Sequence, residues 1–246
     1  YSPVETDLYN PCVPGSRLGV TADELKELPA GIDGLHFHVL CESRPHHLRL
    51  ALEAVEKHFG QYLDRIKWLN MGGGHLMTHA EYDCDELIAL LREFKARHPH
   101  LRLILEPGSA FTWRTGYLVS TIEDLVENAG VHTAMLDVSF ACHMPDCLEM
   151  PYKPAIVGAH EPAEGEKRWR MGGTSCLAGD YYGDWAFDRE LKVGERIVFE
   201  DMIHYTMVKT TMFNGVAHPA IVIARRDGRI DVVREFGYED FRNRMS

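Results

Sequence analysis

The segment LNMGGGHLM, residues 69–77, contains the feature that best indicates the fold. Its first residues read as the end of a strand, and three consecutive glycines, Gly72, Gly73 and Gly74, follow where that strand ends. Glycine brings no side chain to a core, so a run of glycines indicates that another group comes very close to the main chain. The segment therefore predicts a strand end at which another group lies directly against the main chain.

Strands and helices alternate on both sides of this segment. Apolar residues recur at helical spacing in 45–66 and again in 85–98. Between and around these helices, strands are predicted at 34–40, 67–71 and 101–108. Strands that alternate with helices form consecutive βα units, and such units have parallel strands.

The three predicted strand ends are evenly spaced along the chain. His38, Gly72 and Glu106 lie at or just past them, and the intervals are 72 − 38 = 34 and 106 − 72 = 34. A (β/α)8 TIM barrel has roughly 30 residues per unit. Three units on their own predict either the end of such a barrel or part of an open, doubly wound sheet.

The second half of the chain has a different pattern. Alternating apolar residues predict strands at 118–128, 132–140, 195–213 and 219–236. Asp227-Gly228 is a hairpin turn signal inside the last of these segments. No long amphipathic helix is predicted there, and 142–184 reads as a long loop. We therefore expect an α/β region over residues 1–116 and an antiparallel β domain over 117–246.

The first thirty residues are rich in proline, glycine and aspartate and read as loop. One short helix is expected within them, at 21–28. Thr21 would be its N-cap, and Glu24 would complete a capping box three residues later.

Composition excludes several classes of protein. The chain has 246 residues, a net charge of −11 and 45% apolar residues. The negative charge argues against nucleic acid and anionic membrane surfaces as partners and is compatible with a cationic substrate, although ordinary acidic solubility explains it equally well. No apolar run approaches the ~18 residues of a membrane span, and the first residues do not resemble a signal peptide.

Cysteine usage indicates a cytoplasmic protein with reduced thiols. The six cysteines show no tight spacing, and a chain of this length does not need disulfides. Cys142, His143 and Cys147 come nearest to a metal motif, but no second cluster with ligand spacing accompanies them. We therefore expect no metal site.

Three kinds of chemistry meet at the predicted strand ends. Backbone N–H groups of Gly72 to Gly74 can face an anion such as a phosphate. The carboxylate of Glu106 can hold a protonated ring nitrogen, and the imidazole of His38 can lie against a ring face. A tight turn, a surface glutamate and a core histidine are the ordinary alternatives for the three features. Together they suit a phosphorylated pyridine, pyridoxal 5′-phosphate.

Several motifs resemble the alanine-racemase-fold decarboxylases that use pyridoxal phosphate, a family that includes ornithine and diaminopimelate decarboxylases. The motifs are FHV, GGG, EPGS, TSCLAGD and HYTMVKTTMFNG, in that order. Segments such as LHFHVLCES and LDVSFACHMPDCLEMPYKP are most similar to its carboxynorspermidine (carboxyspermidine) decarboxylase branch. The resemblance covers nearly the whole chain. It implies decarboxylation of carboxynorspermidine to norspermidine, or of carboxyspermidine to spermidine, in polyamine biosynthesis.

The resemblance also assigns roles to residues. His38 would stack on the pyridine ring, Gly72, Gly73 and Gly74 would bind the phosphate, and Glu106 would pair with the pyridine nitrogen. Tyr205 would donate its hydroxyl to the phosphate. Cys176 would protonate the carbanion after decarboxylation, acting from the partner subunit of an obligate homodimer with shared active sites. From the residues alone, Cys176 reads equally as a loop cysteine and Tyr205 as a strand aromatic.

Acids near these motifs are candidates for binding the substrate amines. Asp146 and Glu149 lie in the segment that carries the amine-binding acid in related decarboxylases, and the sequence does not choose between them. Two positions depart from the ornithine type. Ser109 replaces an arginine that grips the phosphate, and Leu177 replaces an acid after the cysteine, so that Asp180 is the first acid downstream. Both departures point away from ornithine.

The lysine that such enzymes need for the Schiff base with the cofactor has no counterpart here. That lysine lies on the first barrel strand, and none of the eight lysines lies in such a context. We therefore expect this chain to be the C-terminal part of a longer enzyme and to be inactive alone. Another basic amino acid decarboxylase of the same fold is the alternative function, and a non-catalytic homologue is a second one.

Overall fold

The computed structural model describes residues 1–246, which form two compact units, Tyr1–Trp113 and Arg114–Ser246. The first unit is built on three parallel strands in the order β1 (Gly34–His36), β2 (Trp68–Asn70) and β3 (Arg102–Ile104). This confirms the predicted parallel βα units, although each strand is only three residues long.

The register of this sheet explains the spacing of 34. Leu35 lies opposite Leu69, and Leu69 lies opposite Leu103. The offsets are 69 − 35 = 34 and 103 − 69 = 34, the same intervals that separate His38, Gly72 and Glu106. Residues that share this offset lie in one row across the sheet, so the three strand ends are neighbours.

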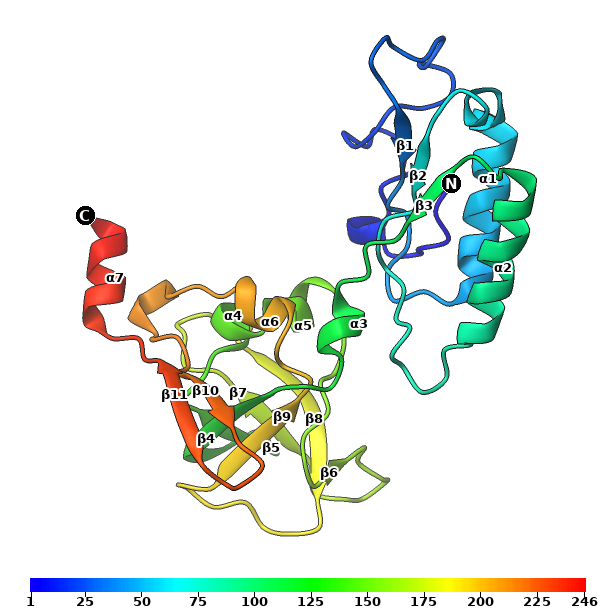
Figure 1. The fold of residues 1–246 in the computed structure, drawn as a ribbon. Coiled ribbons are helices and arrows are strands. Elements are labelled where there is room, and N and C mark those ends of the chain that lie inside the picture. Colours follow the sequence, from blue (N-terminus) through cyan, green and yellow to red (C-terminus); the bar gives the residue numbers. More distant parts are fainter. The chain divides into compact units, whose positions relative to one another are not determined.

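Two long helices cover one face of the three strands (Figure 1). They are α1 (Pro45–Leu63) and α2 (Cys84–Arg97), and both confirm the sequence prediction. Proline begins α1, where its missing N–H costs no hydrogen bond. Asp83 caps α2, because its carboxylate accepts a hydrogen bond from the N–H of Glu86 at 2.8 Å. The buried sides of both helices pack on the strands and form the core of this unit.

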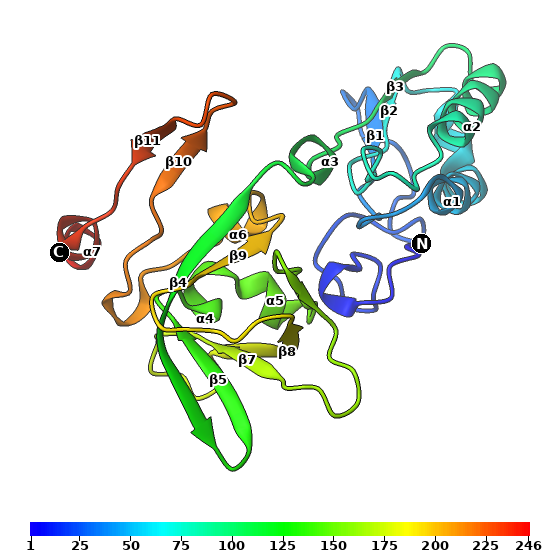
Figure 2. The same cartoon turned by 90° about the horizontal axis from the view of Figure 1, so that it is seen from below.

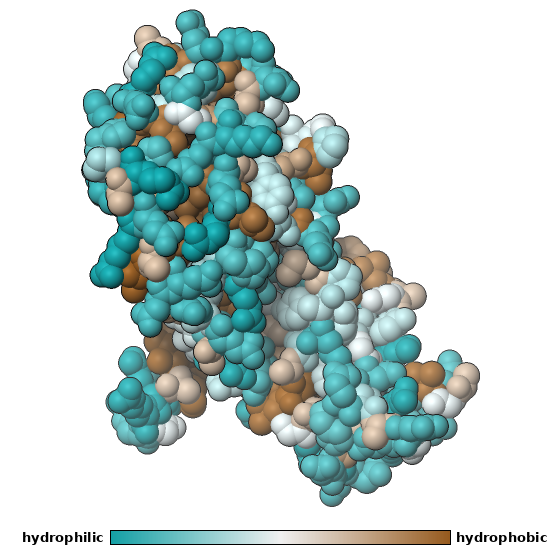
Figure 3. Space-filling view, turned by 90° about the vertical axis from the view of Figure 1, so that its right-hand side faces the viewer, coloured by the Kyte–Doolittle hydropathy of each residue, from teal (hydrophilic) through white to brown (hydrophobic).

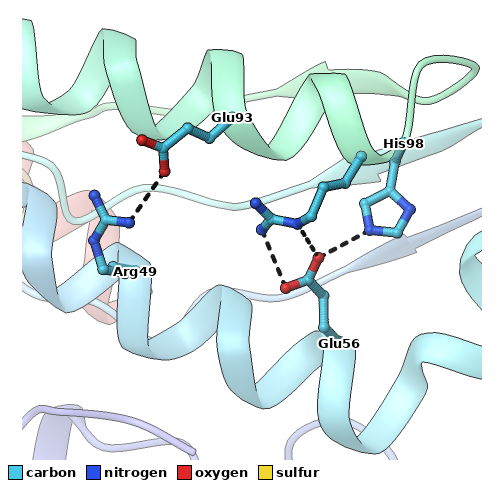
Figure 4. A network of polar contacts seen from close by, with 5 residues as sticks. Arg49, Glu56, Glu93 and His98 are labelled. Carbon is cyan, nitrogen blue, oxygen red and sulfur yellow. Dashed lines mark hydrogen bonds and ion pairs between the residues drawn. The ribbon is translucent and has the colours of Figure 1, made fainter.

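Ion pairs connect α1 and α2 on their exposed sides (Figure 4). Glu56 accepts hydrogen bonds from Arg97 at 2.9 Å and from His98 at 3.0 Å, and Arg49 pairs with Glu93 at 3.2 Å. These side chains are partly exposed, so each pair contributes up to about 1 kcal/mol. The apolar contacts beneath them are therefore the main source of stability.

The helix predicted at 21–28 does not form. The segment is a turn in which the N–H of Thr21 donates to the Glu24 carboxylate at 3.3 Å. One contact of the predicted capping box is thus present, but most of the segment is exposed and no helix follows it. A helix this short needs tertiary packing to be stable, and the segment has little.

The second unit contains a six-stranded sheet with the order β6-β8-β7-β5-β4-β9. Its strands are β4 (Tyr117–Asn128), β5 (Val131–Leu136), β6 (Ala159–His160), β7 (Trp169–Gly172), β8 (Tyr181–Phe187) and β9 (Arg196–Glu200). All neighbours are antiparallel except β5 and β7, which are parallel. The sheet is therefore mixed, and the prediction of a purely antiparallel domain was wrong on this point.

The segment 142–184 is not the loop that its weak periodicity indicated. It contains α5 (Pro145–Glu149), β6, β7 and the start of β8, after the short helix α4 (Phe140–His143). Strand β7 lies inside the sheet with both edges paired, but it is only four residues long, so its sequence shows no extended alternation.

The predicted strand 195–213 is also only partly correct, because β9 ends at Glu200 and the short helix α6 (Tyr205–Val208) follows. A 3-10 turn, Phe213–Gly215, comes next.

Aromatic residues dominate the core of the second unit. Phe140 and Phe199 are fully buried and meet edge to face at 5.8 Å between ring centres. On the face of the molecule drawn in Figure 3, hydrophilic side chains predominate and apolar ones lie between them. No helix combines the length and the apolar character that crossing a membrane requires.

The chain ends in a hairpin and a helix. Strands β10 (Ile221–Ala224) and β11 (Ile230–Arg234) pair antiparallel around Asp227-Gly228, which confirms the turn signal. The hairpin forms a sheet of its own and adds no residue to the core of the larger sheet (Figure 2). Helix α7 (Tyr238–Met245) follows it and was not predicted, since no residue of this helix is buried and it has no strong apolar pattern.

Candidate active site

The three strand ends of the first unit meet at one edge of its sheet. His38 follows β1, Gly72 to Gly74 follow β2, and Glu106 follows β3; we call these residues the strand-end cluster. The N–H of Glu106 donates to the carbonyl of Gly72 at 2.7 Å, so the sheet pairing continues past the strands. The structure thus brings together the first-unit residues that the sequence singled out.

The protein's own backbone explains all three glycines. A Cβ atom on Gly72 would meet the carbonyl oxygen of Phe37, and one on Gly73 would meet that of Glu106. A Cβ on Gly74 would overlap the carbonyl of Leu40, and Gly74 also has a φ of 86°. The close approach that the sequence predicts at this strand end is therefore made by the protein's own main chain. Neighbouring loops already require each glycine.

Two of the three glycine N–H groups donate within the protein. Gly72 donates to Asn70 Oδ1 and Gly73 donates to His38 Nδ1, both at 2.9 Å. The N–H of Gly74 has no acceptor in the protein. If this loop binds an anion without rearrangement, Gly74 is its free donor.

Asn70 is a member of the cluster that sequence reasoning missed. Its Nδ2 donates to Glu106 Oε1 at 2.7 Å while its Oδ1 accepts from Gly72, so one side chain joins the glycine loop to the carboxylate. Glu106 is exposed and keeps Oε2 free of protein hydrogen bonds. The available signal was a polar residue at the end of an apolar strand, two positions before the glycines.

His75 was also missed. It directly follows the glycines, is 2% exposed, and places Nδ1 3.4 Å from the hydroxyl of Tyr82. Its Nε2 has no hydrogen-bond partner. Burial, aided by the nearby His38, lowers the pKa of His75 to about 4, so the imidazole is neutral near pH 7.

Ser109 begins the short helix α3 (Ser109–Thr112) just after Glu106-Pro107-Gly108. It is half-buried, and its carbonyl accepts a hydrogen bond from the hydroxyl of Thr112 at 3.4 Å. Its place in the chain next to Glu106 is compatible with the cofactor contact expected from the sequence.

In the second unit, both candidate amine-binding acids contact an internal lysine. The ammonium of Lys209 lies 2.5 Å from Asp146 Oδ1 and also pairs with Glu149. Asp146 is buried and Glu149 is exposed. The structure thus brings these two acids together around a lysine that the sequence analysis did not connect with them.

Asp180 is buried and fully engaged by the surrounding loops. Its Oδ1 accepts from the N–H of Ala141 and its Oδ2 from that of Ser175, both at 3.0 Å. Burial alone would raise the pKa of Asp180, but these hydrogen bonds and one from Ser139 outweigh it, so the pKa is lowered. The carboxylate closes the loop that carries Cys176 and fastens it to α4.

Cys176 is exposed in that loop, and its N–H donates to Asn214 Oδ1 at 2.9 Å. Asn214 belongs to the FNG motif and has a φ of 60°, a conformation that asparagine tolerates. Tyr205 begins α6 and is 52% exposed. The structure thus connects two of the motifs, TSC and FNG, by a hydrogen bond.

Five of the cysteines, Cys12, Cys84, Cys142, Cys147 and Cys176, form no disulfide. Cys147 is buried, and burial raises the pKa of its thiol to about 11, which makes it a poor nucleophile. No group of three or more His, Cys, Asp or Glu side chains is arranged to hold a metal ion.

The strand-end cluster fits a phosphorylated pyridine. Glu106 offers one free carboxylate oxygen held in place by Asn70, and Gly74 offers a free N–H at the exit of a parallel strand. Ligands of parallel α/β folds bind at this edge of the sheet. An anion donor and a carboxylate on neighbouring strands match the two ends of pyridoxal phosphate.

Comparison with known proteins gives several matches. Carboxyaminopropylagmatine decarboxylase of Synechocystis sp. is 61% identical over 246 residues, all of this chain and 64% of that protein. Carboxynorspermidine/carboxyspermidine decarboxylase of Campylobacter jejuni is 40% identical over 98% of this chain and 66% of that protein. The chain thus spans about two thirds of the length of these curated relatives.

Solved structures agree with these matches. The crystal structure of carboxynorspermidine decarboxylase from C. jejuni, complexed with norspermidine, superposes with a TM-score of 0.86 at 39% identity, covering 94% of this chain and 65% of that one. Diaminopimelate decarboxylase from M. jannaschii shares the fold, with a TM-score of 0.63 at 20% identity over 83% of this chain and 50% of that one.

A family match extends across both units. Residues 32–203 match the family described as pyridoxal-dependent decarboxylase, C-terminal sheet domain. This range contains the strand-end cluster and the loop of Cys176, the features that the sequence singled out. From this match, the chain belongs to the pyridoxal-dependent decarboxylase family.

Proposed function

We propose that the full-length protein removes the α-carboxylate of a carboxylated polyamine in polyamine biosynthesis, with pyridoxal 5′-phosphate as cofactor. The observation that supports this most strongly is the 61% identity, over every residue of the chain, to a decarboxylase of that substrate class. In the reaction the carboxylate leaves as carbon dioxide and a proton replaces it on the α-carbon.

Two substrates of this class are candidates. Carboxynorspermidine, with its carboxyspermidine analogue, is the substrate expected from the sequence motifs. It also appears in the name of the 40% identical relative. Carboxyaminopropylagmatine appears in the name of the 61% identical relative, and this higher identity favours carboxyaminopropylagmatine as the substrate. The two differ at the distal end, which is an ammonium in the first and a guanidinium in the second.

The residues of the strand-end cluster have separate tasks in this proposal. The cofactor, once bound, supplies an electron sink for the bond that loses carbon dioxide. Glu106, held by Asn70, keeps a proton on the ring nitrogen. His38 covers a face of the ring, and the glycine loop, through Gly74, donates to the phosphate. Ser109 adds an uncharged contact.

The residues of the second unit keep the roles that the family resemblance implies. Tyr205 would donate to the phosphate, and Cys176 would return the proton to the α-carbon within a homodimer. The resemblance also assigns Asp146, Glu149 and Asp180 to the substrate amines. In the structure, however, Asp146 and Glu149 pair with Lys209, and Asp180 accepts from backbone N–H groups.

The architecture proposed for the whole enzyme follows from its two parts. Residues 1–116 would supply three βα units of a (β/α)8 barrel, and 117–246 would form the β domain after it. The parallel strands at an offset of 34 support the first assignment, and the six-stranded mixed sheet supports the second.

Purified full-length protein tests the function. Carboxyaminopropylagmatine, carboxynorspermidine, diaminopimelate and ornithine are each supplied with the cofactor, and carbon dioxide release is measured. We expect a kcat/KM for one of the two carboxylated polyamines well above that for diaminopimelate or ornithine. Preference for either of the last two would support the alternative basic amino acid decarboxylase. Absence of release from all four, with the cofactor bound, would support a non-catalytic homologue.

A further inference from the structure

Lys209 joins two helices of the second unit. It follows α6, and its ammonium pairs with Asp146 and Glu149, which both belong to α5. These two hydrogen bonds raise the pKa of Lys209, so it carries its charge throughout the physiological range. The pair with Asp146 is partly buried, which protects it from screening by salt.

Further contacts fasten the segment after Lys209 to the same place. The N–H of Thr211 donates to the carbonyl of Cys142 at 2.9 Å. The thiol of Cys142 in turn lies 3.7 Å from the carbonyl oxygen of Phe213. Residues 205–214 therefore lie along α4 and α5, with the ion pairs at one end of the attachment and Phe213 at the other.

Cys176 itself contacts this segment, whereas Asp180 holds the rest of its loop. The N–H of Cys176 donates a hydrogen bond to Oδ1 of Asn214, the residue that follows Phe213. Asn214 presents its side chain there from a left-handed backbone conformation, with a φ of 60°. A shift of 205–214 would therefore move the acceptor that holds Cys176.

We propose that Lys209 is a positioning residue: its pairing with Asp146 and Glu149 fixes segment 205–214, and through Asn214 it fixes the loop of Cys176. The inference rests on the proposed function only in giving Cys176 a role in the reaction. It assigns Asp146 and Glu149 a structural task, because an ammonium of the protein already lies where a substrate amine would have to bind.

Hydrogen exchange of the full-length protein, followed by mass spectrometry, tests the coupling without substrate or cofactor. We expect Lys209→Met to speed exchange by about fivefold both in peptides of 205–214 and in the peptide of Cys176, the effect of losing a partly buried ion pair. Lys209→Arg should retain both pairs and restore slow exchange. Lys167→Met is the matched control, because it removes an exposed pair with Glu190 in the same unit.

Steady-state kinetics separate this proposal from substrate binding by the acids. If Lys209 positions Cys176, Lys209→Met and Glu149→Gln should both lower kcat and leave KM nearly unchanged. If the acids bind the substrate, Glu149→Gln should raise KM while Lys209→Met lowers it. Unchanged exchange at Cys176 in Lys209→Met, with faster exchange in 205–214, would overturn the coupling. Neither exchange result depends on whether the protein is a decarboxylase.

Discussion

Asn70 Nδ2 donates a hydrogen bond of 2.7 Å to Glu106 Oε1, and the same side chain accepts one from the N–H of Gly72. An amide with one donor and one acceptor in use is held in a single orientation. Asn70 thereby holds the carboxylate of Glu106 next to the glycine loop. The two strand ends are connected by a side chain as well as by the sheet.

Replacing Asn70 by leucine should weaken cofactor binding. Glu106 would lose its partner and sample other rotamers, and the N–H of Gly72 would lose its acceptor. We expect the Kd for pyridoxal phosphate to rise by about tenfold, the effect of one hydrogen bond to a charged group. Titration of full-length apoprotein by absorbance measures it.

Two comparisons make this prediction specific. Asn243→Leu lies in the exposed helix α7 and should leave the Kd unchanged. Asn70→Asp keeps the acceptor for Gly72 but places a second carboxylate beside Glu106, so it should weaken binding at least as much as leucine. An unaltered Kd in Asn70→Leu would show that Glu106 needs no such support.

Gly73→Ala should destabilise the first unit. Its Cβ would overlap the carbonyl oxygen of Glu106, which is backbone and cannot rotate away. Overpacking of this kind costs about 1–3 kcal/mol of unfolding free energy. Urea denaturation of the full-length protein should detect it.

The matched control for this change is Gly60→Ala in α1. Apart from its chain neighbours and the backbone of α1 itself, no atom lies within 4 Å of the Cβ that alanine would add at Gly60. Alanine favours a helix over glycine by about 0.5–1 kcal/mol, so this variant should be more stable than the wild type. Equal stability of Gly73→Ala and wild type would mean that the loops around the glycines relax more freely than the structure indicates.

The sequence predicted local features of the fold well where a pattern repeats along the chain. The offset of 34 between strand ends equals the offset between paired residues of neighbouring strands. Consecutive βα units of equal length place equivalent residues side by side. Strand β7 was missed for the opposite reason. It is only four residues long, so its Trp-Arg-Met alternation is too short to stand out as a repeating pattern.

The candidate site was predicted in part, since the motifs identify residue types but not their partners. Asp180 was expected to face a substrate, yet it accepts a hydrogen bond from Ala141, thirty-nine residues away. Lys209 meets acids sixty and sixty-three residues earlier in the chain. Such pairs are set by tertiary packing, so no spacing in one sequence reveals them.

Asp180→Asn should destabilise the second unit at neutral pH. The hydrogen bonds that Asp180 accepts lower its pKa in the folded state relative to the ordinary value of 3.8. A lowered carboxyl pKa stabilises the fold above the unfolded-state pKa, and this stability is lost as pH falls through the folded-state value. At neutral pH the unfolding free energy of the variant should be about 1–3 kcal/mol below that of the wild type. This difference between the two proteins should shrink below pH ~3.8.

Denaturation of both proteins across this pH range measures the effect. Asp188→Asn, at an exposed position after β8, is the control and should follow the wild type at every pH. A difference that stays constant down to the most acid conditions would mean that shape, and not charge, is what the loop needs at position 180.

His75 should make the first unit sensitive to mild acid. Its pKa is lowered from 6.5 to about 4 by burial, so the folded state resists a proton that the unfolded state accepts. Above pH ~6.5 both states are neutral there and no effect is expected. Between pH ~6.5 and ~4 the unfolding free energy should fall, by about 2 kcal/mol at pH ~5, because only the unfolded state binds the proton.

His75→Asn should remove this sensitivity, since asparagine can replace Nδ1 near Tyr82 and does not titrate. Between pH ~7.5 and ~5, the unfolding free energy of the variant, measured by urea denaturation, should thus fall by about 2 kcal/mol less than that of the wild type. His143 of the second unit, whose pKa burial likewise lowers to about 4, contributes equally to both proteins and cancels in the difference. His58→Asn, on the exposed side of α1, is the control. If the unfolding free energies of His75→Asn and wild type fall equally with acid, water must reach the unpartnered Nε2 of His75 and let it protonate within the fold.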